Sequence, residues 1–65
     1  MPSSKKKARE RILEAAVESF QTQGYARTTT HAIAQKAGVA EITLFRHFGD
    51  KQTLFQAAVQ QIGGG

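Results

Sequence analysis

Apolar residues recur along the first third of the chain at the spacing of a helix. At about 100° per residue, five of them share one side: Ile12, Leu13, Ala16, Val17 and Phe20. Acidic and amide side chains take the opposite side, and Gly24 follows where a helix end favours a residue that tolerates positive φ. The pattern predicts an amphipathic helix over residues 8–23.

The same offsets return near the end of the chain, in Leu54, Phe55, Ala58, Val59 and Ile62. They predict a second amphipathic helix over residues 54–62. Asp50 is the predicted N-cap, because its carboxylate can accept a hydrogen bond from a backbone N–H of the first turn. Gly63 ends this helix and opens a glycine tail over residues 63–65, which we expect to be flexible.

Two shorter helices are predicted between these. Thr29 can cap a helix over residues 30–37, with Ile33, Ala34 and Ala37 facing inward. Gly38 breaks it, and a helix over residues 40–48 follows with Leu44 and Phe48 on its buried side. No segment alternates as a strand would, so the chain is predicted to be all-α.

The short link between the middle helices defines the fold class. About three residues join them, which forces a steep crossing as in a helix-turn-helix. We therefore predict a homeodomain-like bundle of about four helices. It divides into a flexible basic arm over residues 1–7, the helix-turn-helix domain over residues 8–62 and the tail.

The outer side of residues 40–48 carries candidate chemistry for DNA. If Leu44 and Phe48 face inward, Ile42 and Arg46 point away from the core, with Thr43 and Phe45 beside them. A helix fits the major groove, where an arginine can pair with guanine, a threonine can donate a hydrogen bond, and an apolar side chain can meet a thymine methyl.

Helix starts add candidate phosphate contacts. Thr30 and Lys51 lie in the first turns of their helices, where free N–H groups and partial positive charge suit a phosphate oxygen. Glu41 either stabilises the start of its own helix or accepts a hydrogen bond from a cytosine amine.

Composition narrows the function classes. A chain of 65 residues is one small domain with little room for a deep substrate cavity. It has no cysteine, no nucleophile–base set and only two histidines, so we expect no enzyme, cofactor or metal site. We also expect no signal peptide and no membrane span. The net charge of +4 suits an anionic partner, although charge alone favours a solvated basic surface.

A family resemblance joins these observations. The stretch TTTHAIAQKAGVAEITLFRHFGDKQTLFQAAV, from Thr28 to Val59, resembles the DNA-binding domain of the tetracycline-repressor (TetR) family. That family's pattern is approximately T-x-x-x-I-A-x-x-A-G-V-s-x-x-T-L-Y-x-Y/H-F-x-s-K-x-x-L. The preceding ILEAAVESFQTQGY resembles its first helix, so the likeness covers about residues 8–62.

The resemblance implies a cytoplasmic transcriptional regulator, usually a repressor, that binds a double-stranded DNA operator as a homodimer. A small molecule bound to a further domain releases the DNA. That domain is absent, so the chain resembles a truncated module, which we expect to be monomeric. With Arg46, the residues implied near DNA are Thr30, His31, Glu41, Ile42, Thr43, Phe45, His47 and Lys51. The implied flanking arm contains Lys5, Lys6, Lys7 and Arg9.

Some positions depart from the family pattern or admit other roles. Phe45 replaces a tyrosine and lacks the phenol that would bond a phosphate, and Ala40 replaces a frequent serine cap. Instead of contacting DNA, His47 could be a partly buried structural histidine. His31 could be exposed simply because it lies at the start of a helix. For the whole chain, the alternatives are a protein-interaction module, which would use the apolar face of residues 54–62, and a basic amphipathic helix on a membrane surface.

Overall fold

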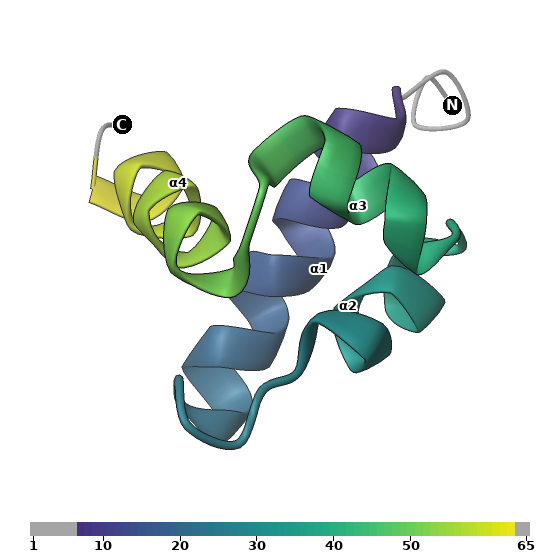
Figure 1. Cartoon of the computed structure of the whole chain (residues 1–65). Coiled ribbons are helices and arrows are strands. Elements are labelled where there is room, and N and C mark those ends of the chain that lie inside the picture. Colours follow the sequence, from purple (N-terminus) through teal and green to yellow (C-terminus); the bar gives the residue numbers. More distant parts are fainter. Residues whose placement is uncertain (1–6, 64–65) are drawn as a thin grey trace, which may run out of the picture.

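The computed structural model describes residues 7–63 and contains four helices, with no strand in that range (Figure 1). They are α1 (Ala8–Gln23), α2 (Thr30–Ala37), α3 (Glu41–Phe48) and α4 (Lys51–Gly63). The all-α prediction is confirmed. The arm residues Lys5 and Lys6 and the tail residues Gly64 and Gly65 lie outside the described range.

The first helix organises the core. Ile12 and Ala16 are fully buried, Leu13 and Phe20 are nearly so, and Val17 is half-buried against them. The predicted stripe of α1 therefore faces inward. In Figure 1, α4 lies on one side of α1 and α2 lies on the other, and α1 contacts all three remaining helices.

The predicted caps are confirmed. The side chain of Thr29 accepts a hydrogen bond from the Ala32 N–H at 3.1 Å and starts α2. Asp50 Oδ1 accepts one from the Thr53 N–H at 2.8 Å. Because Asp50 caps the helix, α4 begins at Lys51, as the predicted N-cap implies, three residues before the apolar stripe begins. The helix also includes Gly63.

The apolar stripe predicted for α4 is only partly buried. Leu54 and Ala58 are buried and Phe55 is half-buried, but Val59 and Ile62 are about half exposed. Within residues 7–63, the apolar stripe of α4 is therefore buried only as far as Ala58. Periodicity gives the side of the helix that is apolar and does not give the length over which a neighbour covers it.

The connection from α1 to α2 is fixed by a residue that sequence patterns did not single out. Thr28 is almost completely buried. Its Oγ1 lies 2.7 Å from the Gly24 carbonyl oxygen and 3.1 Å from that of Ser19, with the hydroxyl as donor. This hydroxyl attaches the start of α2 to the end of α1.

Candidate nucleic-acid interface

The outer side of α3 is exposed, as the helical pattern predicted. Leu44 is fully buried on the inner side, and Phe48 is nearly so. On the other side Ile42 is 62% exposed and Phe45 39%, while Arg46 and His47 are also exposed. Thr43 is half-buried. An exposed β-branched apolar residue beside a cation gives α3 a surface suited to base edges as well as to phosphates.

The orientation of α3 is set by the turn that precedes it. Gly38 adopts the left-handed conformation with φ 77° and ends α2. The Val39 N–H then donates to the Ala34 carbonyl at 3.0 Å, and Val39 packs against the core. Ala34 is buried, and its small side chain suits the close approach of the two helices. Figure 1 shows α2 and α3 running in different directions from this turn.

The start of α3 lacks a side-chain cap. Ala40 occupies the N-cap position, as expected from its replacement of a serine, and no side-chain hydrogen bond is made there. Its carbonyl accepts from the Thr43 and Leu44 N–H groups at 3.0 and 3.3 Å. The first turn of α3 is thus closed by the backbone alone.

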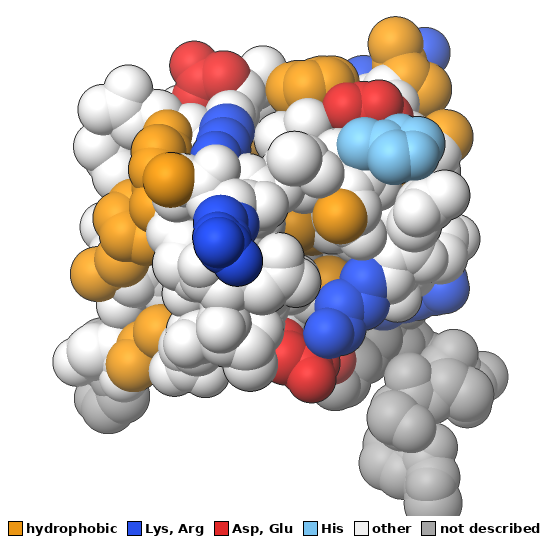
Figure 2. All heavy atoms as spheres, turned by 90° about the horizontal axis from the view of Figure 1, so that it is seen from below, with side chains coloured by type: hydrophobic (Ala, Val, Ile, Leu, Met, Phe, Trp, Pro, Cys, Tyr) orange, Lys and Arg blue, Asp and Glu red, His pale blue; other side chains and the backbone are white. Residues whose placement is uncertain are grey.

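Glu41 links the first turns of the two middle helices. Its Oε2 accepts a hydrogen bond from Thr30 Oγ1 at 2.9 Å, and its Oε1 lies 3.5 Å from His31 Nδ1. In Figure 2 a histidine lies against an acidic side chain on the exposed surface. These three side chains, each predicted to lie near DNA, are therefore brought together, with Glu41 in contact with both Thr30 and His31. Sequence reasoning missed this bridge, because Glu41 is eleven residues from Thr30.

Lys51 lies on an aromatic platform at the start of α4. Its Nζ is 4.2 Å from the centre of the Tyr25 ring, a cation–π distance. Tyr25 folds back onto the core, with its ring centre 5.8 Å from that of Phe20 and 5.0 Å from that of Phe55. The platform holds the lysine near the surface while its charge stays accessible.

The predicted flanking arm divides into two parts. Lys7 is exposed and immediately precedes α1, and its backbone N–H donates to Glu10 Oε1 at 3.3 Å. Arg9 lies within the first turn of α1, and its guanidinium carbon is 5.1 Å from the centre of the Phe48 ring. Arg9 thus connects the start of α1 to the last turn of α3.

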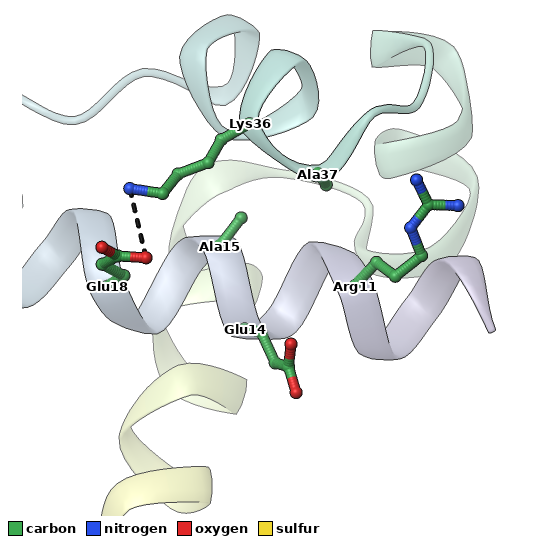
Figure 3. Close-up of a pocket in the computed structure, with 6 residues that line it drawn as sticks. All are labelled: Arg11, Glu14, Ala15, Glu18, Lys36 and Ala37. Carbon is green, nitrogen blue, oxygen red and sulfur yellow. Dashed lines mark ion pairs between the residues drawn. The ribbon is translucent and has the colours of Figure 1, made fainter. Parts of the chain in front are cut away.

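A shallow hollow of about 310 Å³ lies between α1 and α2 (Figure 3). Lys36 Nζ pairs with Glu18 Oε1 at 3.2 Å across it, and Ala15 points from α1 toward α2. Arg11 and Glu14 also line the hollow, so its basic and acidic side chains are equal in number. Among residues 7–63, no three histidine, cysteine or acidic side chains group as metal ligands would, and no helix is long and apolar enough to cross a membrane.

A helix with one side buried, joined by a tight turn to a second helix with an exposed outer side, defines a helix-turn-helix DNA-binding domain. The chain belongs to the tetR family of bacterial regulatory proteins, whose family model matches residues 12–58. The family is one of transcriptional regulators.

Named relatives agree with this assignment. Over 51 residues the chain is 49% identical to the uncharacterized HTH-type transcriptional regulator YvkB of Bacillus subtilis (strain 168). The aligned segment is 78% of this chain and 27% of that protein. Over 60 residues the chain is 42% identical to the nucleoid occlusion factor SlmA of Marinobacter nauticus. The aligned segment is 92% of this chain and 31% of that protein. The chain thus spans about a third or less of the relatives it matches. No solved structure is significantly similar to it.

Proposed function

We propose that the chain recognises a double-stranded DNA operator by placing the outer side of α3 in the major groove, and that it represses transcription. The observation that carries this proposal is the exposure of Ile42, Phe45 and Arg46 on a helix whose other side is fully buried. A helix held in this way presents a fixed surface to base edges.

Each exposed side chain has a defined role in this arrangement. Arg46 pairs with guanine or neutralises a phosphate, Ile42 meets a thymine methyl, and Thr43 donates to a base edge or phosphate. Phe45 packs on a sugar, and His47 donates to a phosphate.

Phosphate contacts lie on both sides of α3. Thr30 and His31 belong to the start of α2, and Lys51 belongs to the start of α4. Phosphate contacts from two helix starts would fix the register of α3 in the groove. Flanking phosphates would be neutralised by Lys7 and Arg9. Lys5 and Lys6, which lie outside the described residues, would do the same.

Selection of bound duplexes from random DNA, followed by titration of a selected and a scrambled duplex at moderate salt, tests the proposal. We expect the selected duplex to bind more tightly, and equal affinities would refute specific recognition. Lys51→Ala should weaken both duplexes alike and reduce the slope of log K against log salt by about one unit, as expected for one phosphate contact. Ile42→Ala should instead change which sequences are selected.

For the longer protein we propose a cytoplasmic homodimer that carries a separate effector-binding domain, as the resemblance implies. Two copies would read two half-sites, so this chain alone should bind one half-site with lower affinity. We expect it to sediment as a monomer, and a stable dimer at micromolar concentration would contradict this.

The exposed Val59 and Ile62 on α4 favour a second candidate, a docking surface for another helical protein. Sedimentation combined with a DNA titration separates the two functions. Oligomerisation without a response to DNA would support docking in place of operator binding.

A further inference from the structure

Glu41 places a negative charge where the proposed function needs DNA phosphates to approach. It stands in the first turn of α3, yet its carboxylate contacts two side chains of the first turn of α2. One oxygen accepts from Thr30 and the other pairs with His31. These are the two α2 residues proposed to contact phosphate, so Glu41 already occupies the groups that a phosphate would use.

The surroundings favour an anion at this position. A helix start carries partial positive charge, and α2 and α3 both begin here. A carboxylate oxygen and a phosphate oxygen accept the same hydrogen bonds from a hydroxyl or an imidazole N–H. The Glu41 side chain is 41% exposed, which leaves room for it to move when another anion approaches.

A purely local role would not require this orientation. An acidic residue in the first turn of α3 already favours its own helix start without touching another element. The 2.9 Å bond to Thr30 shows that the side chain is instead turned toward α2.

We propose that Glu41 is a specificity-determining residue that competes with DNA phosphate for Thr30 and His31. Every complex must displace the carboxylate, and this weakens binding to unrelated sequences, which depends on phosphate contacts. An operator that places a cytosine amine near the displaced carboxylate gives it a new donor and recovers the loss. The inference rests on the proposed function.

The test compares Glu41→Gln with Glu18→Gln, which removes the same charge from α1, where Glu18 pairs with Lys36. Each variant is titrated with the selected and the scrambled duplex. We expect Glu41→Gln to tighten binding of the scrambled duplex about two- to fivefold, the range of one helix-terminus charge interaction. The ratio of selected to scrambled affinity should fall. Glu18→Gln should change both duplexes less and leave the ratio unchanged.

A second background identifies the route of the effect. When Thr30→Val and His31→Ala are both present, Glu41→Gln should no longer favour the scrambled duplex, because the two groups for which Glu41 and phosphate compete are gone. An equal gain in that background, or equal effects of Glu41→Gln and Glu18→Gln, would show a general charge effect and overturn the inference. Urea unfolding of each variant confirms that it is folded.

A measurement on the unchanged chain avoids variants altogether. Adding the scrambled duplex should shift the imidazole NMR signals of His31, since its carboxylate partner is exchanged for phosphate. If the selected duplex binds specifically but these signals stay fixed, only the Glu41 inference fails. If the two duplexes bind with equal affinity, the proposed function itself is refuted.

Discussion

The second and third helices have equal lengths but are stabilised in different ways. Each has eight residues. The α2 helix starts with a side-chain cap from Thr29 and buries three residues, Ile33, Ala34 and Ala37. The α3 helix starts at the uncapped Ala40 and buries two, Leu44 and Phe48. Since isolated helices this short are marginal in water, α3 depends on its tertiary contacts more than α2 does.

This difference suits a helix that presents a surface. Most side chains of α3 point outward, so few are left to stabilise it, and two buried anchors keep it in place. The polar side chain of its first turn, Glu41, contacts α2 instead of capping α3. The α2 helix therefore helps to hold α3 in position, and α3 presents its exposed side chains.

The largest expected effect comes from removing an anchor. Leu44→Ala should lower the free energy of unfolding by about 3 kcal/mol, because a fully buried leucine leaves a cavity. In a domain of this size that is enough to unfold a large fraction of molecules. Urea unfolding followed by circular dichroism measures it. Ile42→Ala, on the exposed side of the same helix, should change stability by less than about 0.5 kcal/mol, and equal losses would break the comparison.

The turn between the two helices ranks next. Gly38→Ala should cost about 1–2 kcal/mol, because an L side chain is strained in the left-handed conformation. A Cβ there would also lie 2.7 Å from Arg11 Nη2, so the guanidinium must move. Gly38→Ala in an Arg11→Ala background is the control, because the guanidinium that the new Cβ would meet is then absent. An equal loss of stability in the two backgrounds would show that contact with Arg11 is unimportant.

The caps give smaller effects of opposite sign. Thr29→Ala should lower the free energy of unfolding by about 1 kcal/mol, because it removes the acceptor for the Ala32 N–H. Ala40→Ser should raise it by about 0.5 kcal/mol by giving α3 the cap it lacks. Thermal unfolding of the two variants side by side measures both changes. A loss of stability in Ala40→Ser would mean that the first turn of α3 cannot accept a local cap.

The smallest effect concerns the cap of α4. The Thr53 backbone N–H donates to Asp50 and lowers the pKa of this carboxyl below its usual value of 3.8. The folded-state pKa is depressed, so the stabilisation is fully present above the unfolded value and is lost as the pH falls through and below it. Urea midpoints between neutral pH and about pH 3 should therefore fall less steeply in Asp50→Asn, which can cap without titrating. Identical pH profiles would contradict this.

Local sequence determined the positions of the helices and most caps, whereas contacts between distant residues were not predictable. Helical periodicity identified the buried sides of α1 and α3, and glycines marked the turns. Three consecutive threonines show the limit of such reasoning. Thr28 is buried against α1, Thr29 caps α2 and Thr30 contacts Glu41. The cap made by Thr29 is local and was predictable, whereas the contacts of Thr28 and Thr30 depend on what the folded chain brings nearby.

The candidate site was predictable in part for the same reason. Which side chains of α3 face outward follows from the helical repeat and the choice of Leu44 as an inner residue. The bridge from Glu41 to Thr30 and His31, and the placement of Lys51 over Tyr25, follow from how helices pack, which the repeat of one helix does not contain. The exposure of Val59 and Ile62 likewise depends on where neighbouring elements end.

The buried hydroxyl of Thr28 makes the link between the first two helices a connection of fixed length. Inserting one residue between Gly24 and Thr28 would move this oxygen away from both carbonyls and turn every later helix relative to α1. Protein engineers who need a permissive position for a loop graft should therefore avoid residues 25–27, although all three are exposed.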